Sequence, residues 1–176
     1  MKDIWITSDT HFGHSNIIEY GPRPFNNIHQ HDQTLLENWN SVVKPGDKVY
    51  HLGDVYMDCS GEYAWEILKR LHGKKRLILG NHDDGKNAVL QRWFQEIIMW
   101  RAWGDLGLIL SHVPLHESNL GTRCKKRILN VHGHIHGNPS PSIQYMNACV
   151  EWTQYKPIHL DECIARQKVY ENERPT

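Results

Sequence analysis

Apolar residues fall into two alternating patterns along the first half of the chain. The short runs Ile4–Thr7, Lys48–Leu52 and Arg76–Leu79 are typical of buried strands. Between them, apolar positions recur at helical spacing over about His29–Val43 and Glu62–Leu71, which predicts two helices that pack on the sheet. The first half therefore reads as strand, helix, strand, helix and strand.

Single residues add detail to these helices. Ser15 is predicted to cap a short helix through Tyr20, which Gly21 ends. Trp39 and Trp65 fall on the inward faces of the two longer helices, so we expect both indoles in the core.

The second half changes pattern. A short helix is predicted near Asn87–Phe94, and the runs Glu96–Trp100 and Leu108–Leu110 are predicted to be neighbouring strands of a mainly antiparallel sheet. A strand over Tyr145–Val150 and a closing helix over about Asp161–Tyr170 follow. We expect one domain over residues 1–176, with two sheets and the helices outside them.

Five polar motifs stand directly after apolar runs. Because the carboxyl ends of strands are where open α/β sheets bind ligands, we expect these motifs to meet at one edge. Five of the 13 histidines lie in them, which favours metal ligation for those five. The motifs are Asp9-Thr10-His11, Gly53-Asp54, Gly80-Asn81-His82-Asp83, Ser111-His112 and Gly133-His134-Ile135-His136.

The motifs supply seven nitrogen or oxygen ligands, enough for two metal ions that share one carboxylate. Mixed imidazole and carboxylate ligands favour transition metals over Mg or Ca, with Mn as the leading candidate and Fe, Zn, Ni or Co as alternatives. His82 is left over and suited to protonate a leaving oxygen, with Asp83 holding its tautomer. The seven predicted ligands are Asp9, His11, Asp54, Asn81, His112, His134 and His136.

The ordered series D-x-H, G-D, G-N-H-D, H and G-H-x-H, from Asp9 to His136, resembles the calcineurin-like metallophosphoesterase superfamily. The opening Ser8–His14 is similar to that of small, capless bacterial and bacteriophage members, and Arg23-Pro24-Phe25 and Asn147–Glu151 are similar more loosely. The resemblance implies a four-layer α/β/β/α sandwich of two mixed sheets.

The resemblance also implies a role for each ligand. Asp54 would bridge the ions, with His82 and Asp83 as the acid–base pair. The first ion would take Asp9, His11, Asp54 and His136, and the second Asp54, Asn81, His112 and His134.

The leading hypothesis is a dinuclear phosphoesterase for a small phosphodiester or nucleotide, in which a metal-bridging hydroxide attacks and His82 is the general acid. A nuclease of the same mechanism and a non-catalytic, metal-dependent interaction module are the alternatives. His14 could line the substrate pocket or be a plain loop residue, and Arg23 could clamp a phosphate or be a solvated arginine.

The composition limits the classes of partner that the protein can bind. Lys+Arg and Asp+Glu are 20 each, so the formal net charge is zero, which argues against general nucleic-acid binding. A local cluster, Arg123, Lys125, Lys126 and Arg127, could still steer an anionic substrate. No apolar run approaches the roughly 20 residues of a membrane span.

The four cysteines form no C-x-x-C pair, so we expect reduced thiols in a cytoplasmic protein.

Overall fold

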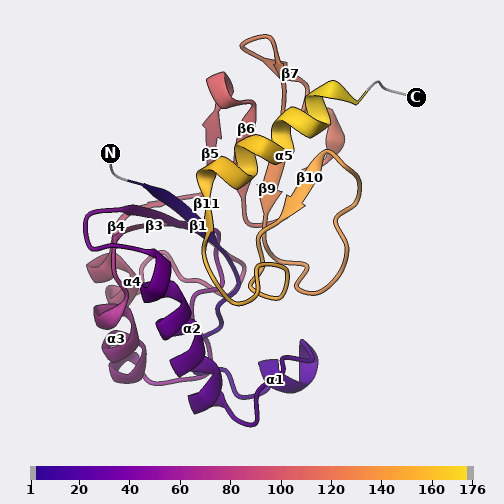
Figure 1. Cartoon of the computed structure of the whole chain (residues 1–176). Coiled ribbons are helices and arrows are strands. Elements are labelled where there is room, and N and C mark those ends of the chain that lie inside the picture. Colours follow the sequence, from indigo (N-terminus) through magenta and orange to yellow (C-terminus); the bar gives the residue numbers. More distant parts are fainter. Residues whose placement is uncertain (1–2, 174–176) are drawn as a thin grey trace.

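Two mixed β-sheets form the centre of the structure, a computed structural model that describes residues 3–173 (Figure 1). In the first sheet, all neighbouring strands are parallel except β11, which runs antiparallel to β1. The order of this sheet is β11 (Ile158–His159), β1 (Ile4–Thr7), β2 (Lys48–His51), β3 (Lys74–Ile78) and β4 (Phe94–Ile98).

The second sheet has four strands, of which only β5 and β6 pair in antiparallel fashion. Its order is β10 (Tyr145–Asn147), β9 (Leu129–His132), β6 (Leu108–Ser111) and β5 (Trp100–Trp103). A separate hairpin joins β7 (Thr122–Arg123) to β8 (Lys126–Arg127).

The predicted pairing of Glu96–Trp100 with Leu108–Leu110 in a mainly antiparallel sheet is wrong. β4 lies in the first sheet, where Ile97 pairs with Leu77. The chain bends at Met99, and β5 then begins the second sheet. Because the apolar run continues through the bend, its periodicity could not show that it serves two sheets.

Five α-helices and two short 3-10 segments surround the sheets in the described part of the chain. Asn27, Ser60 and Asn87 cap α2, α3 and α4 through their side chains. The predicted cap at Ser15 is wrong, because α1 begins after Asn16 and has no side-chain cap. The elements are α1 (Ile17–Tyr20), α2 (Ile28–Val42), α3 (Gly61–Arg70), α4 (Ala88–Trp93), η1 (Gly104–Leu106), η2 (Glu117–Asn119) and α5 (Leu160–Asn172).

Helices α2, α3 and α4 share one hydrophobic core with the first sheet. Trp39 lies in this core and is 1% exposed, as predicted, beside Ile67 and Leu77. Trp65 was predicted to lie inward but is 36% exposed, and its ring meets that of Trp93 edge to face at 5.2 Å. Trp65 therefore lies at the rim of the core.

A second core fills the space between the two sheets. Ile6 from the first sheet, Leu110 from the second and Cys163 from α5 all belong to it. The opposite face of the second sheet packs through Ile109 against Leu120 of the segment that follows β6. The predicted mixed α/β class, with two mixed sheets flanked by helices, is confirmed.

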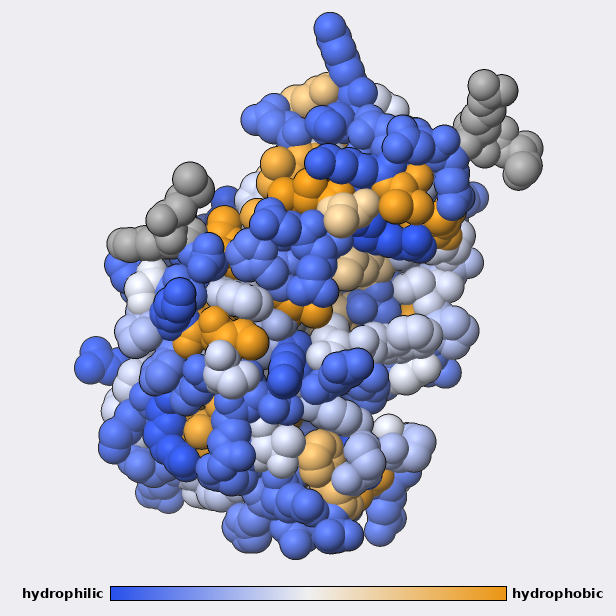
Figure 2. Space-filling model, in the orientation of Figure 1, coloured by the Kyte–Doolittle hydropathy of each residue, from blue (hydrophilic) through white to orange (hydrophobic). Residues whose placement is uncertain are grey.

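The face of the molecule in Figure 2 is mostly hydrophilic, with scattered apolar spots. Over residues 3–173, the helices are too short or too polar to cross a membrane. All four cysteines, Cys59, Cys124, Cys149 and Cys163, are free thiols.

Candidate metal centre

The polar motifs meet because the strands before them are parallel. Asp9 follows β1, Asp54 follows β2 and Asn81 follows β3 in the first sheet, while His112 and His134 follow β6 and β9 in the second. Backbone hydrogen bonds join the loops, from Asp9 N to Gly53 O at 3.0 Å and from Gly133 N to His112 O at 2.8 Å.

The loops hold an unusual backbone conformation at the ligand positions. Five of the seven predicted ligands have a positive φ, although none is glycine. A left-handed conformation costs a non-glycine residue about 1–3 kcal/mol and clusters at functional sites. The five are Asp9 (57°), His11 (46°), Asp54 (56°), His134 (72°) and His136 (49°).

Two glycines allow the loops to approach closely. A Cβ at Gly53 would lie 2.5 Å from Gly80 N, and one at Gly133 would lie 2.3 Å from Asp9 Oδ2. Both distances are too short for any side chain, so these positions require glycine.

One oxygen of the buried Asp9 carboxylate is held by its neighbours. Asp9 Oδ2 accepts hydrogen bonds from His134 N at 2.9 Å, from Cys149 Sγ at 3.3 Å and from the Ser8 hydroxyl. These bonds fix the carboxylate plane, and burial raises the pKa of Asp9.

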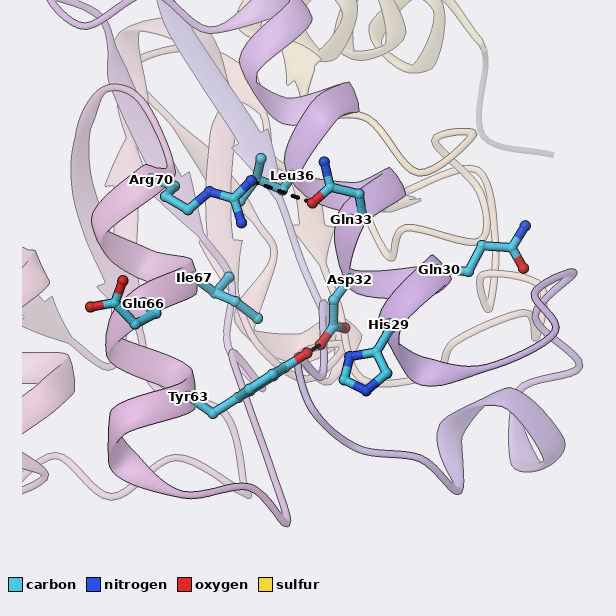
Figure 3. A pocket seen from close by; sticks show the side chains of 9 residues that line it. All are labelled: His29, Gln30, Asp32, Gln33, Leu36, Tyr63, Glu66, Ile67 and Arg70. Atoms are coloured by element: carbon cyan, nitrogen blue, oxygen red, sulfur yellow. Dashed lines mark hydrogen bonds between the residues drawn. The ribbon is translucent and has the colours of Figure 1, made fainter.

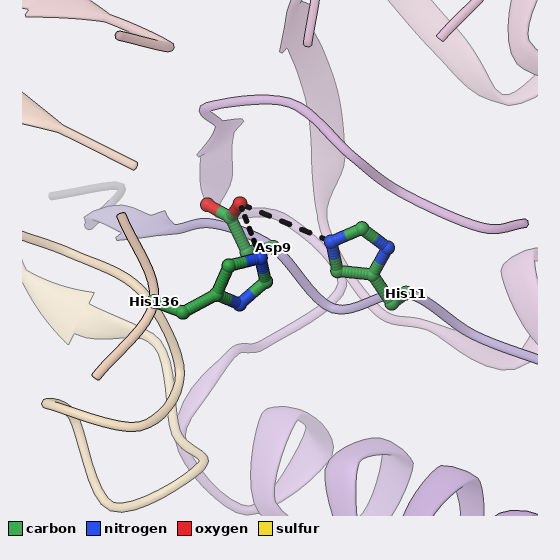
Figure 4. A group of neighbouring side chains, drawn as sticks. All are labelled: Asp9, His11 and His136. Carbon is green, nitrogen blue, oxygen red and sulfur yellow. Dashed lines mark ion pairs between the residues drawn. The ribbon is translucent and has the colours of Figure 1, made fainter. Parts of the chain in front are cut away.

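The other Asp9 oxygen, Oδ1, is buried without a hydrogen-bond partner. It lies 4.0 Å from His11 Nε2 and 3.9 Å from His136 Nε2 (Figure 4). An oxygen and two imidazole nitrogens thus surround one small volume.

Asp54 stands between the two groups of histidines. Its Oδ2 lies 3.6 Å from His11 Nε2 and 3.5 Å from His112 Nε2, while Oδ1 accepts a bond from His82 N at 3.0 Å. One Asp54 oxygen therefore faces both ligand groups, the position expected of a bridging carboxylate.

The second ligand group brings lone pairs together. His112 Nδ1 lies 2.8 Å from Leu52 O, an acceptor, so Nδ1 carries the proton and Nε2 of the neutral ring offers a lone pair. Asn81 Oδ1 lies 2.8 Å from that Nε2 and 2.8 Å from His134 Nδ1. Several acceptors this close together are stabilised by a cation among them.

His11 gives the clearest test of whether these residues fit a metal. Its ring is buried, and neither ring nitrogen has a hydrogen-bond partner. Burial, and after it the positive charge of Arg23, lower the pKa of His11 to about 2, so the ring stays neutral with an open lone pair. Together with the bare Asp9 oxygen, this donor set fits divalent metal ions.

Two clusters in residues 3–173 have metal-ligand geometry, and Asp9 belongs to both. They are Asp9 with His11 and His136, and Asp9 with Asp54 and His112. Each of the seven predicted ligands takes part in the contacts described above.

His82 and Asp83 lie at the site but do not pair. The His82 ring is exposed, with its centroid 5.8 Å from that of His11. The Asp83 carboxylate accepts bonds from Gly80 N (2.9 Å), Asp54 N (2.8 Å) and Val55 N (3.0 Å). The expected Asp83–His82 contact is therefore not formed, because these three amides occupy the carboxylate, which ties two ligand loops together.

His14 lies in the cavity beside His11, as one of its two interpretations expected. It is 5% exposed, and its Nδ1 is 2.8 Å from Asp58 Oδ2. Its ring centroid lies 5.9 Å from that of His11. His14 thus remains a candidate for substrate contact.

Arg23 does not fit the phosphate-clamp interpretation, nor that of a solvated arginine. It is 3% exposed, and its N–H groups donate to Glu151 Oε1, Thr10 O, Asp9 O and His31 Nε2 at 2.7–3.1 Å. All five guanidinium donors are used, so none is left for a substrate. Arg23 instead braces the loop that carries Asp9.

Glu151 is the main site residue that the motifs missed. Its Oε1 lies 3.0 Å from His136 Nδ1, which leaves His136 Nε2 facing Asp9. Burial would raise the pKa of Glu151, but the bond from His136 and the charge of Arg23 outweigh it and lower that pKa. The looser similarity of Asn147–Glu151 was the only sequence signal for it.

The basic cluster Arg123–Arg127 lies away from the site. Its strand β8 contacts η1, ahead of β6, whereas His112 follows the other end of β6. Arg127 donates to Tyr170 O at 3.0 Å, and Figure 1 places β7 far from the ligand loops. The predicted steering of substrate by this cluster is not supported.

A groove of about 530 Å³ between α2 and α3 contains none of the predicted ligands (Figure 3). At its base, Tyr63 OH donates to Asp32 Oδ2 at 2.8 Å.

Comparison with known proteins identifies the family. The family description "calcineurin-like phosphoesterase" matches residues 2–167. An uncharacterized protein of Methanocaldococcus jannaschii is 36% identical over 169 residues, covering 92% of this chain and 89% of that protein. The gene 66 protein of Mycobacterium phage L5 is 32% identical, covering 77% of this chain and 78% of the phage protein.

A solved structure has the same fold. The crystal structure of a protein of unknown function from Aquifex aeolicus superposes with a TM-score of 0.72 at 31% identity. The match covers 93% of this chain and 98% of that one.

Proposed function

This chain belongs to the calcineurin-like phosphoesterase family, and we propose that it hydrolyses small phosphodiesters with two divalent metal ions. Family membership implies metal-dependent hydrolysis of phosphoesters. The observation that carries the finer proposal is the position of Asp54 Oδ2, 3.6 Å from His11 Nε2 and 3.5 Å from His112 Nε2.

Asp9, His11, Asp54 and His136 would hold one ion, and Asp54, Asn81, His112 and His134 the other. Ions bound there would supply an activated water and neutralise charge that develops on the phosphoryl oxygens. Manganese is our first choice, because mixed imidazole and carboxylate ligands suit it.

His82 is the proposed general acid. Its exposed ring borders the cavity beside His11, and its backbone N–H is already bound to Asp54. The loop therefore fixes the backbone while the ring stays free to give a proton to the leaving oxygen. Asp83 supports this by holding the loop rather than by contacting the ring.

Two observations favour a small substrate over nucleic acid. The chain has zero formal net charge, and its basic cluster lies at the far end of the second sheet. A non-catalytic interaction module would have no use for a free imidazole beside a full ligand set.

The test compares bis(p-nitrophenyl) phosphate, p-nitrophenyl phosphate and a dinucleoside monophosphate on metal-stripped protein reloaded with Mn, Ni, Zn or Mg. We expect diester turnover that depends on a transition metal. His82→Ala should lower kcat about 10²–10⁴-fold for the dinucleoside substrate, and less for the aryl esters, because p-nitrophenolate leaves without a proton.

His29→Ala is the matched control, since His29 is also exposed but lies in the groove of Figure 3. Protein that binds two metal ions yet turns over none of these esters would contradict the proposal and favour the interaction module.

A further inference from the structure

Two cavities lie side by side at the candidate metal centre. One is about 510 Å³ and the other about 450 Å³, both within the range of small-molecule sites. They share Tyr20, Gly21, His136 and Asn138 in their walls. Because His136 is a predicted ligand, the two cavities form two arms of one cleft that meet at the metal centre.

The arms differ in chemistry. His82 lines only the first arm, with His11 and the apolar Met57. The second arm is lined by Tyr155 and Pro22. A proton donor therefore stands in the first arm, while the second adds the flat rings of Tyr155 and Pro22 to polar wall residues such as Glu151.

Neither arm offers a free cationic side chain. No Lys or Arg of the described residues lines either cavity. The two acidic residues are paired, Asp58 with His14 at 2.8 Å and Glu151 with Arg23 at 2.7 Å. Metal ions would thus be the main positive charge in the cleft, which suits one phosphate and no more.

Tyr20 stands at the junction of the arms. Tyr20 is 74% exposed, although Ile17 of the same helix is only 5% exposed. The backbone bond from Arg23 N to Ile18 O at 3.1 Å fixes the end of this helix. The tyrosine ring is therefore a flat, open surface on an anchored element beside the metal centre, as in sites where planar groups stack.

We propose, on the basis of the phosphoesterase function above, that the substrate is a phosphodiester with a single phosphate and a planar ring, such as a nucleobase, on one of its two ester groups. The ring-bearing group lies in the second arm between Tyr20 and Tyr155. The other ester group lies in the first arm, beside His82, and is the one that leaves.

The reaction balances as a hydrolysis. Water oxygen forms a bond to phosphorus, and the bond from phosphorus to the first-arm oxygen breaks. His82 gives its proton to that oxygen and regains one from the attacking water. The products are an alcohol and a phosphomonoester that keeps the planar group.

Two esters with the same leaving group test the second arm. These are the p-nitrophenyl ester of thymidine 5′-monophosphate and methyl p-nitrophenyl phosphate, assayed on the Mn-loaded protein. We expect kcat/KM to favour the thymidine ester about tenfold or more. Tyr20→Ala should remove most of this preference for the thymidine ester over the methyl ester, while Tyr20→Phe keeps it.

Calorimetry gives a readout that is independent of turnover. Thymidine 5′-monophosphate should bind the Tyr20→Ala variant about tenfold more weakly than the native protein, whereas methyl phosphate should bind both equally. Trp65→Ala, which removes an exposed aromatic ring from α3, is the control and should leave both affinities unchanged.

The outcomes separate this inference from the function on which it rests. Turnover of both esters without preference, or an equal loss on both in Tyr20→Ala, would overturn the stacking role alone. Turnover of neither ester with any metal would overturn the proposed function. Tighter binding of thymidine 5′-triphosphate than of the monophosphate would overturn the single-phosphate limit.

Discussion

Two buried carboxylates, Asp32 beside the groove between α2 and α3 and Asp9 at the candidate metal centre, have very different surroundings. Asp32 Oδ1 lies 2.7 Å from His31 Nδ1, and its Oδ2 accepts bonds from Gly13 N and Tyr63 OH (Figure 3). Asp9 Oδ1 is buried without a hydrogen-bond partner, and His11 and His136 approach it only to about 4 Å (Figure 4).

The difference distinguishes a carboxylate that is buried for stability from one that is buried for function. A buried polar group without a partner costs about 1–3 kcal/mol, and a fold keeps it only when something else compensates. At the metal centre, Asp9 Oδ1 and both nitrogens of His11 are unpaired together. In the groove, both carboxylate oxygens of Asp32 have hydrogen-bond partners. Unpaired atoms gathered on neighbouring predicted ligands, rather than buried charge as such, distinguish the metal centre from the groove.

The largest effect should come from removing a carboxylate of the metal centre, compared with the carboxylate of the groove. Asp54→Asn weakens the proposed bridge, so we expect kcat/KM to fall about a thousandfold and the bound metal to drop below two ions per chain. Asp32→Asn should lower the free energy of unfolding by about 1–3 kcal/mol while kcat/KM stays within about tenfold. Steady-state kinetics, metal analysis and denaturant unfolding check this. Equal losses of activity in both variants would remove the distinction.

A smaller effect is expected at Glu151. Its Oε1 is paired within the protein, as the carboxylate of Asp32 is, but one of its partners is the predicted ligand His136. Glu151→Gln removes the charge that orients His136 and balances Arg23. We expect Mn affinity, measured by calorimetry, to fall about 10–100-fold, and the melting temperature to decrease. Glu62→Gln, an exposed residue of α3, is the control. Unchanged Mn affinity in Glu151→Gln would show that His136 needs no such support.

The smallest effect on the metal centre is expected from a buried charge on the helix-covered face of the first sheet, which acts on stability alone. Burial lowers the pKa of Lys75 from 10.5 to about 8, and its Nζ donates to Leu71 O at 2.7 Å. Between these two pH values the unfolded chain holds more protons than the folded one, so stability rises with pH.

Lys75→Met should therefore be more stable than the native protein below pH 8, by up to about 3 kcal/mol less the lost Leu71 bond, and this gain should shrink toward pH 10.5. Its kcat should not change. Lys74→Met, the exposed neighbour on β3, is the control. A gain that does not vary with pH would contradict the role assigned to the buried charge.

Much of the fold, and the grouping of the candidate ligands, could be predicted because both follow from local sequence patterns. An apolar run followed by Asp-x-His or Gly-Asp places polar groups at a strand end, and parallel strands bring those ends together. The bend at Met99, which divides one apolar run between two sheets, had no such local mark.

The sequence by itself determined the order of the strands and helices that carry the motifs, and which seven side chains were available as ligands. Only the tertiary structure decided that the guanidinium of Arg23 bonds to groups of the protein itself, that Asp83 binds loop amides and that Glu151 orients His136. Arg23 and Glu151 lie 128 positions apart in the chain. A hydrogen bond depends on which groups the packed sheets bring within about 3 Å, and no local pattern contains that distance.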